Sequence, residues 1–237
     1  AEFAGCPALS EGDKAGTPDP GPENMDGFVL GKLVAHGGMG AVYRAREPGL
    51  YRDVAIKFLR MGQSEVEWIK RFRKEAEILA NLQHPHVVQL YRVGVNQGRY
   101  YLAMEWLEGG TLEPLLDAPL AQAMPVFLQV VDAVAYLHRR GIIHRDLKPQ
   151  NVIVTSHGAK LIDLGLAKNL EASQALTRTG QIMGTLYFLA PELLENVGAD
   201  ARSDVFSLGV ILYRILSGTY PRSGNTFDDM LRDVRQG

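Results

Sequence analysis

HRDLKPQN, residues 144–151, and LIDLG, residues 161–165, are the most informative stretches of this sequence. The first holds Asp146, Lys148 and Asn151, and the second holds Asp163 in front of a glycine. Asp and Asn are common in ordinary capped turns, but a capped turn explains neither the lysine nor the second aspartate. Mg²⁺ prefers oxygen ligands, and phosphoryl transfer needs metal ions on the phosphate oxygens and a carboxylate that orients the attacking hydroxyl. We therefore interpret the two stretches as a phosphoryl-transfer site.

A glycine-rich stretch, AHGGMGAV at Ala35–Val42, lies upstream between two β-type runs. Glycine lets a backbone approach a phosphate closely, because no side chain intervenes. A β-hairpin with permissive turn residues is the simpler alternative for this stretch alone. The sequence does not match GxxxxGK[ST] and no helix follows the glycines, so Walker-type and Rossmann sites are not expected.

The stretch VAIK, Val54–Lys57, reads as a strand in which Ala55 and Lys57 share one face. A strand lysine is usually solvated at an edge, but here a partner is available. Residues 65–82 have helical spacing, and Glu75 falls on the apolar face of that helix. An unpaired buried charge is costly. We expect a Lys57–Glu75 ion pair that holds the ammonium group toward phosphates.

Composition limits the function classes. The 237 residues are 46% hydrophobic with a net charge of −2, which allows a real core and argues against a general nucleic-acid binder. The single Cys6 excludes an intramolecular disulfide framework and a multi-cysteine zinc site. No apolar run approaches the length of a membrane span, and no signal peptide is visible, so neither is expected in this stretch.

Charge and periodicity divide the chain. Residues 1–26 carry six acids and one base, a net charge of −5 that leaves +3 for the rest, and we expect a disordered acidic linker there. The domain is expected over 27–237, β-rich first and helix-rich later, in an α+β fold. The expected strands are Phe28–Val34, Ala41–Arg46, Asp53–Leu59, Val87–Tyr91, Arg99–Glu105, Val152–Val154 and Lys160–Ile162. The expected later helices are Leu120–Arg139 and Ser203–Leu216, the second buried on most sides.

In order and spacing, these motifs resemble those of the Hanks-type (eukaryotic-like) serine/threonine protein kinases, particularly bacterial members. The resemblance runs from about Phe28 to the end of the chain. It implies a two-lobed fold with an N-lobe at 27–108 and a C-lobe at 109–237. The C-lobe is expected to be incomplete, since such domains continue with further helices, one of which would carry the arginine partner of Glu192.

The resemblance also implies a role for each matching residue. ATP and Mg²⁺, with Mn²⁺ as an alternative, are the implied cofactors, and Asp146 is the implied catalytic base. The other implied catalytic residues are Lys57, Glu75, Lys148 and Thr185, the last two marking Ser/Thr rather than Tyr specificity. The implied metal ligands are Asn151 and Asp163. The implied nucleotide contacts are Val34, Ala35, Gly37, Gly38, Gly40, Val42, Ala55, Lys57, Met104, Glu105, Leu107 and Ile153.

Ala35 departs from the family, which has its first loop glycine at that position. We expect slower or weaker nucleotide handling as a result, because the methyl group restricts the hairpin. Leu79, Leu90, His144 and Leu164 match the family's stacked spine between the lobes. Asp204 is expected to cap its helix and to brace the catalytic loop.

Arg145, next to the implied catalytic base Asp146, is expected to need an anionic partner. Thr177 and Thr179 follow in a polar stretch further along the chain. A phosphothreonine adds about −2 charge and can order a loop by pairing with arginine. We expect autophosphorylation at one or both threonines in trans, which requires self-association. The alternative is two threonines on a solvated loop.

The implied partners are proteins with Ser or Thr acceptors, and neither nucleic acid nor a membrane segment is expected in this stretch. The expected location is the cytoplasm, with membrane anchoring of the longer protein through a region beyond Gly237 as the alternative. An ATP-binding pseudokinase or scaffold is the first alternative, and a fragment inactivated by truncation is the second. Lys57, Glu75, Asp146, Asn151 and Asp163 are all present, which favours an active enzyme.

Overall fold

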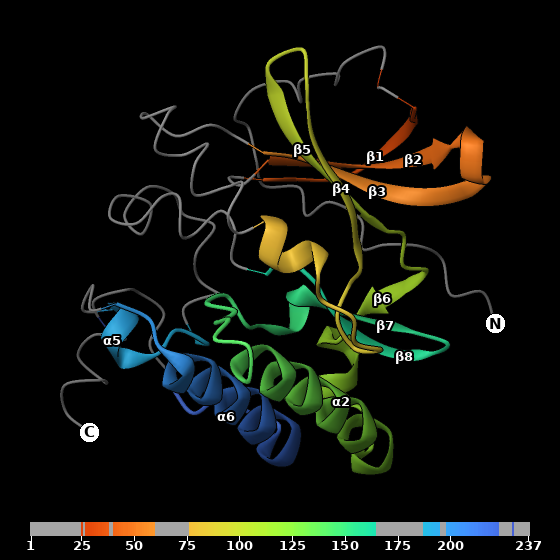
Figure 1. Ribbon diagram of the computed structural model, residues 1–237. Coiled ribbons are helices and arrows are strands. Elements are labelled where there is room, and N and C mark those ends of the chain that lie inside the picture. The colour runs from red at the N-terminus through yellow and green to blue at the C-terminus, as the bar shows by residue number, and fades with distance from the viewer. Residues whose placement is uncertain are drawn as a thin grey trace.

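The computed structural model describes Met25, residues 27–37, 40–59, 76–164, 187–194 and 198–222, and Asp229. They form a strand-rich N-terminal lobe and a mostly helical C-terminal lobe, shown above and below in Figure 1. The expected α+β, two-lobed architecture is confirmed. Most of the expected acidic linker lies outside the described residues, but Met25 is buried in the core of the N-terminal lobe.

The N-terminal lobe is built on a five-stranded antiparallel sheet in the order β1-β2-β3-β5-β4. Its strands are β1 (Val29–Gly37), β2 (Gly40–Glu47), β3 (Arg52–Leu59), β4 (Leu90–Asn96) and β5 (Arg99–Glu105), with the short 3-10 helix η1 (Pro48–Leu50) between β2 and β3. Side chains alternate as VAIK predicted. Val54 and Ile56 lie in the apolar core on one face, while Ala55 and Lys57 point to the other.

One expected strand begins later in the sequence than predicted. The run Val87–Tyr91 was predicted as a strand, but β4 begins only at Leu90. Val88 instead donates its N–H to the carbonyl of Leu161 at 2.9 Å, and Leu161 donates to the carbonyl of His86 at 2.9 Å. The apolar character of Val87 and Val88 therefore reflects burial between the lobes, and only Leu90 and Tyr91 of the run belong to the sheet. The preceding expected helix is described only at 76–80.

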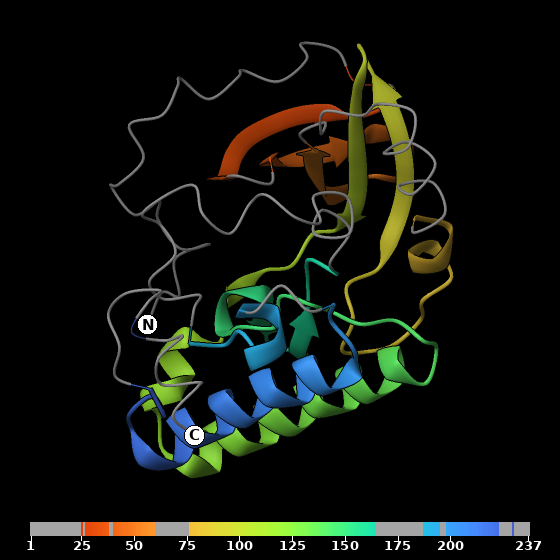
Figure 2. The same cartoon turned by 90° about the vertical axis from the view of Figure 1, so that its left-hand side faces the viewer.

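The C-terminal lobe combines a small sheet with two long helices. Its elements are β6 (Gly109–Thr111), η2 (Glu113–Asp117), α2 (Leu120–His138), η3 (Pro149–Asn151), β7 (Val152–Thr155), β8 (Gly158–Leu161), α5 (Pro191–Leu194) and α6 (Ala201–Ser217). The small sheet has the order β6-β7-β8 and is antiparallel. Figures 1 and 2 show α2 and α6 side by side beneath it. The expected helix from Leu120 is confirmed.

Helix α2 is long and apolar enough to cross a membrane by length and composition, with a mean hydropathy of 1.5. One side of the helix packs against β8 and α6 of the same domain. Phe127, Val130 and Leu137 are buried in a cluster that also takes in Leu79 and Leu90 of the N-terminal lobe. One continuous apolar core therefore joins the two lobes.

Helix α6 corrects two expectations. It is not buried on most sides, because Val205 and Leu216 are 58% and 61% exposed, and the buried face holds Val210 and Ile211. Its N-cap is Asp200, whose carboxylate accepts the N–H of Arg202, and not Asp204. Asp204 lies one turn further on and is 1% exposed, so it is available for contacts outside its own helix.

Candidate active site

The residues expected around the nucleotide lie on adjacent strands of the N-terminal sheet. Ala35 of β1 pairs with Val42 of β2, and Val42 pairs with Lys57 of β3. Ala55 of β3 pairs with Met104 of β5. Paired residues of antiparallel strands present their side chains on the same face. The strands therefore bring these five residues onto adjoining parts of one sheet.

The glycine-rich hairpin closes at the end of β1, where Gly37 pairs with Gly40. Gly40 has a φ of +132°, and a Cβ atom placed on it would lie 1.9 Å from the carbonyl oxygen of Phe58. Glycine at 40 is thus required by the close approach of β3, in addition to any phosphate contact. Val34 also lies on β1, and Gly38 lies outside the described residues.

The remaining expected nucleotide contacts lie where the lobes join. Glu105 ends β5 and Leu107 follows it, immediately before the small sheet begins at Gly109. Ile153 of β7 pairs with Thr111 of β6, so it lies beside this connection from the side of the C-terminal lobe. The nucleotide-contact residues of the N-terminal sheet and Ile153 of the C-terminal lobe therefore lie on opposite sides of the segment that connects β5 to β6.

Lys57 makes an ion pair across the two lobes. Its Nζ lies 2.6 Å from Oδ1 of Asp163, and the lysine side chain is only 9% exposed while that of Asp163 is 30% exposed. Asp163 has a φ of +58°, a left-handed conformation that is uncommon outside glycine and is typical of constrained sites. The pair that the sequence predicted, Lys57–Glu75, lies outside the described residues because Glu75 does.

Asp146 is held by two residues of its own loop. The amide nitrogen of Asn151 donates to the carbonyl of Asp146 at 2.7 Å and to its Oδ2 at 3.1 Å. Lys148 Nζ lies 3.2 Å from the same Oδ2. The Asp146 side chain is 7% exposed, so its carboxylate has one defined orientation in a cationic, largely water-excluded setting.

The donor set of Asn151 and Asp163 fits a magnesium ion. The hydrogen bonds of Asn151 use its nitrogen, which leaves its side-chain oxygen as the ligand atom. The backbone N–H of Ile162 donates to the carbonyl of Asn151 at 2.9 Å. Because Asp163 follows Ile162 directly, this bond brings Asp163 close to Asn151. Mg²⁺ takes few protein oxygens and fills its shell with water and phosphate oxygens. Among the described residues there is no group of three or more His, Cys, Asp or Glu that could hold another metal.

His144 fixes the backbone of the catalytic loop from inside the core. Its Nδ1 accepts the N–H of Asp146 at 3.3 Å, and its Nε2 lies 3.0 Å from the carbonyl of Ile162. The side chain is completely buried, and this burial lowers the pKa of His144 below its usual value. The ring is therefore neutral, with its proton on Nε2. It joins Asp146 to the segment that carries Asp163.

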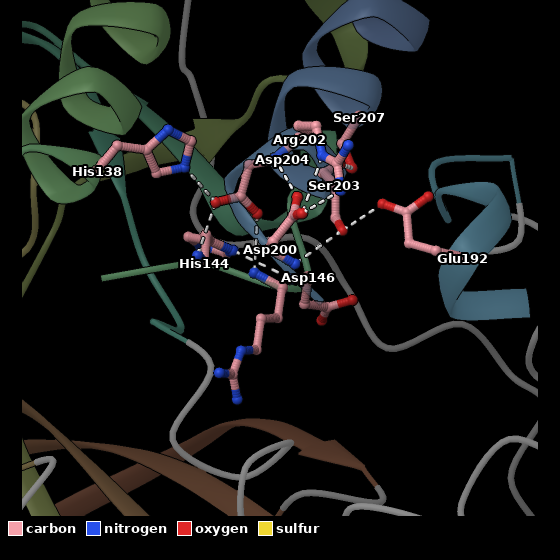
Figure 3. Close-up of polar contacts among 10 residues, drawn as sticks. His138, His144, Asp146, Glu192, Asp200, Arg202, Ser203, Asp204 and Ser207 are labelled. Carbon is pink, nitrogen blue, oxygen red and sulfur yellow. Dashed lines mark hydrogen bonds and ion pairs between the residues drawn. The ribbon is translucent and has the colours of Figure 1, made fainter. Parts of the chain in front are cut away.

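Asp204 of α6 holds the same loop from the side of the long helices (Figure 3). Its Oδ2 accepts the N–H of His144 at 2.8 Å and its Oδ1 accepts the N–H of Arg145 at 2.9 Å. The same Oδ2 lies 2.7 Å from Nε2 of His138, at the end of α2. The expected bracing of the catalytic loop by Asp204 is thus confirmed, and one carboxylate ties together α2, α6 and the loop.

The chain matches the protein kinase domain family over residues 28–236. It belongs to that family. The chain is 37% identical over 215 residues to the serine/threonine-protein kinase PknB of Mycobacterium leprae, a match that covers 86% of this chain and 35% of the relative. It is 37% identical over 205 residues to the serine/threonine-protein kinase PrkC of Bacillus subtilis, covering 84% of this chain and 32% of the relative.

PknB of Mycolicibacterium smegmatis is a further relative of the kinase domain, 38% identical over 217 residues, with 86% of this chain and 35% of the relative covered. The chain thus spans about a third of the length of these curated relatives. The domain is homologous to serine/threonine protein kinases, and the bacterial resemblance that the motifs suggested is confirmed.

Several predicted residues of the kinase domain lie outside the described residues: Gly38, Glu75, Thr177, Thr179 and Thr185. Glu192 is described, in α5, and its Oε1 accepts the hydroxyl of Ser203 at 2.5 Å (Figure 3). Ser203 belongs to the capping box at the start of α6. Within the described part, Glu192 is therefore bound to α6 through a hydrogen bond from an uncharged donor, the Ser203 hydroxyl.

Sequence reasoning missed two contacts that position the kinase site. The sequence assigned no role to His138, yet it contacts Asp204. Lys160 of β8 lies 2.8 Å from Oε2 of Glu105, and so joins the C-terminal lobe to the connection between the lobes. Glu105 was expected only as a nucleotide contact, without a role for its side chain. For the second contact, the only signal in the sequence was a lysine, Lys160, in a predicted strand.

Proposed function

We propose that this kinase domain transfers the γ-phosphoryl group of ATP to serine and threonine hydroxyl groups of proteins. The observation that supports it most is the arrangement of Asp146, Lys148 and Asn151 beside the Lys57–Asp163 pair. Asp146 orients the acceptor hydroxyl and takes its proton as the oxygen attacks the γ-phosphorus, while ADP leaves. Lys148 offsets the negative charge of the transferred group.

Other residues of the chain bind and orient ATP. Lys57 contacts its α- and β-phosphates, with Glu75 as the further partner of the ammonium group. Asn151 and Asp163 hold Mg²⁺, which neutralises phosphate oxygens when bound. The hairpin at Gly37 and Gly40 covers the phosphates, Val42 packs on the adenine, and the domain works in the cytoplasm, where ATP is available.

Radiolabel transfer from ATP with Mg²⁺ to a protein substrate tests the proposal. Asp146→Asn should lower the rate about 10²–10⁴-fold while ATP still binds, because the proton acceptor is lost and the residues expected to contact the nucleotide remain. Lys57→Met should damage transfer more than the melting temperature, since methionine keeps the volume of the lysine stem. Wild-type turnover in Asp146→Asn would contradict the assigned base. Binding of ATP without transfer by the wild-type chain would favour the pseudokinase alternative instead.

We also propose that the domain autophosphorylates at Thr177 or Thr179 in trans. Arg145 supports this, because its Nε is buried and has no hydrogen-bond acceptor among the described residues. Such an atom suits a phosphate group brought by a neighbouring segment. Active chain should label an Asp146→Asn chain at these threonines. Phosphopeptide mapping that finds neither threonine modified in active protein would exclude this regulation.

A further inference from the structure

Arg44 of β2 reaches from the N-terminal lobe to the segment that connects the two lobes. Its guanidinium carbon lies 4.9 Å from the centroid of the Trp106 ring, and its Nη2 lies 3.5 Å from Oε1 of Glu108. Trp106 and Glu108 belong to residues 106–108, which join β5 to β6 and form neither helix nor strand. Because no strand pairing fixes these three residues, their position depends on the contacts of their side chains.

The sheet presents Arg44 on the face that is expected to take the nucleotide. Arg44 follows Val42 by two residues along β2, so the two side chains share one face. Arg44 also pairs with Ala55 of β3, and Ala55 pairs with Met104 of β5. Paired residues of antiparallel strands lie on the same face. Arg44 therefore lies at the edge of the expected adenine site, beside the connection between the lobes.

Asp53 of β3 holds the guanidinium group in place. Its Oδ2 accepts hydrogen bonds from Nη2 of Arg44 at 2.5 Å and from Nε at 3.2 Å. A planar guanidinium bound through two of its nitrogens has a defined orientation, and such a plane stacks well on an aromatic ring. Arg46, two residues further along β2, shares Asp53 at 3.3 Å, but among the described residues it has no contact with the connection.

The Trp106 ring has no hydrogen bond of its own that would orient it. Its Nε1 is buried and has no hydrogen-bond partner among the described residues. The orientation of the ring therefore rests on packing, and Arg44 supplies a contact over its face. A cation above an indole ring is attracted by the negative charge of the ring face. Loss of the guanidinium group should release the ring.

A second ion pair holds the same connection from the C-terminal lobe. Lys160 of β8 lies 2.8 Å from Oε2 of Glu105, the residue before Trp106. Adjacent residues are thus held from opposite lobes. Glu105 and Leu107, the expected nucleotide contacts, lie on either side of Trp106 in the sequence, so a change at Trp106 moves the backbone of both. Hydrogen bonds weaken steeply when their geometry departs from ideal, and a shifted backbone binds a base less well.

We propose that Arg44 is a positioning residue for nucleotide binding, which acts through Trp106 and Glu108 to set the backbone that receives the adenine base. The inference rests on the proposed binding of ATP. It assigns to Arg44 an effect on the base alone, while the phosphates are left to Lys57 and the glycine-rich hairpin.

Nucleotide affinity in Arg44→Gln tests the assignment. Adenosine is the matched probe for ATP, because it carries the base but no phosphate. We expect the KM for ATP and the inhibition constant of adenosine each to rise about fivefold with kcat little changed, since both lost contacts are of modest strength. Arg44→Lys keeps the charge without the planar stack and should give intermediate values. Arg46→Gln, a matched change beside the same Asp53, should leave both constants unchanged.

Fluorescence of Trp106 supplies a second measurement. The chain has two tryptophans, so Trp68→Phe makes Trp106 the only emitter. In that background, Arg44→Gln should shift the emission maximum of Trp106, because the charge over the ring is lost, and Arg46→Gln should not.

Unchanged constants for ATP and adenosine in Arg44→Gln overturn the inference, and so does an equal rise in Arg46→Gln. A rise for ATP without a rise for adenosine also overturns it, because Arg44 would then act on the phosphates. An emission maximum of Trp106 that does not respond to Arg44→Gln excludes the route through the ring. All of these results leave the kinase activity intact. A wild-type chain that binds neither ATP nor adenosine instead overturns the proposed function and this inference with it.

Discussion

Replacing Asp204 by asparagine should destabilise the domain and slow catalysis together. Asparagine has the same shape but only one side-chain acceptor oxygen and no charge. The carboxylate is 1% exposed and accepts the N–H groups of His144 and Arg145 while it contacts Nε2 of His138. No orientation of the asparagine amide preserves all three contacts.

The magnitude follows from the contacts that remain. An amide oxygen in place of Oδ2 keeps the bonds to His144 and His138 as neutral ones, and each loses about 1 kcal/mol relative to a charge-assisted bond. The amide nitrogen then faces the N–H of Arg145, which leaves a buried donor unsatisfied at about 1–3 kcal/mol. Relief from burying a charge offsets part of this, so we expect a net loss of about 2–4 kcal/mol.

Thermal unfolding and kinetics of Asp204→Asn measure both effects. A loss of this size should lower the melting temperature by about 5–15 °C in a domain of about 200 residues. The kcat should also fall while the KM for ATP changes little, because the contacts hold the catalytic loop and not the nucleotide. Asp200→Asn is the matched control, since asparagine also caps helices well and the site is exposed. Equal melting temperatures for the two variants would refute the reasoning.

Two further predictions concern the hairpin and the buried histidine. Gly40→Ala should weaken ATP binding and destabilise the N-terminal lobe by about 1–3 kcal/mol, because the added Cβ meets the Phe58 carbonyl at 1.9 Å in a positive-φ conformation. Gly49→Ala, which meets nothing within 4 Å, is the control, and equal ATP affinity in both variants would contradict the steric argument. Burial holds the pKa of His144 below its ordinary 6.5, so unfolding takes up a proton below about pH 6.5. Stability should therefore fall as the pH drops from about 6.5 toward the folded pKa, by up to about 1.4 kcal/mol per pH unit. His144→Phe should reduce this slope, and urea unfolding that shows an unchanged slope would exclude His144 as its source.

The catalytic motifs could be predicted from the sequence because charged and polar residues in that order and spacing are rarely found for purely structural reasons. HRDLKPQN and VAIK predicted the loop and the strand face, and the structure places Asp146, Lys148 and Asn151 together and Lys57 on the predicted face. Alternation along β3 was reliable because Val54, Ile56 and Phe58 on one face of this strand are buried. The fold class followed from the order of strands and helices.

Contacts between elements that lie far apart in the sequence could not be predicted in this way. Lys160 lies 55 residues from its partner Glu105, and His138 lies 66 residues from Asp204. Hydrophobic periodicity also overstated the burial of α6, because it reports apolar character and not which neighbour covers it. The run at Val87 was misread for a related reason, since burial between lobes and burial in a sheet favour the same residues.

The catalytic loop owes its shape to elements on either side of it rather than to regular structure of its own. Arg145 and Asp163 both have positive φ angles, 65° and 58°, which cost of order 1 kcal/mol or more each outside glycine. Such conformations persist only where the surroundings over-determine them. Here Asp204 binds the N–H of Arg145, and the neutral ring of His144 links the N–H of Asp146 to the carbonyl before Asp163. Because Asp204 is fixed by its position on α6, the packing of α2 and α6 sets the position of the catalytic carboxylate, and changes in that distant packing should alter kcat before they alter ATP binding.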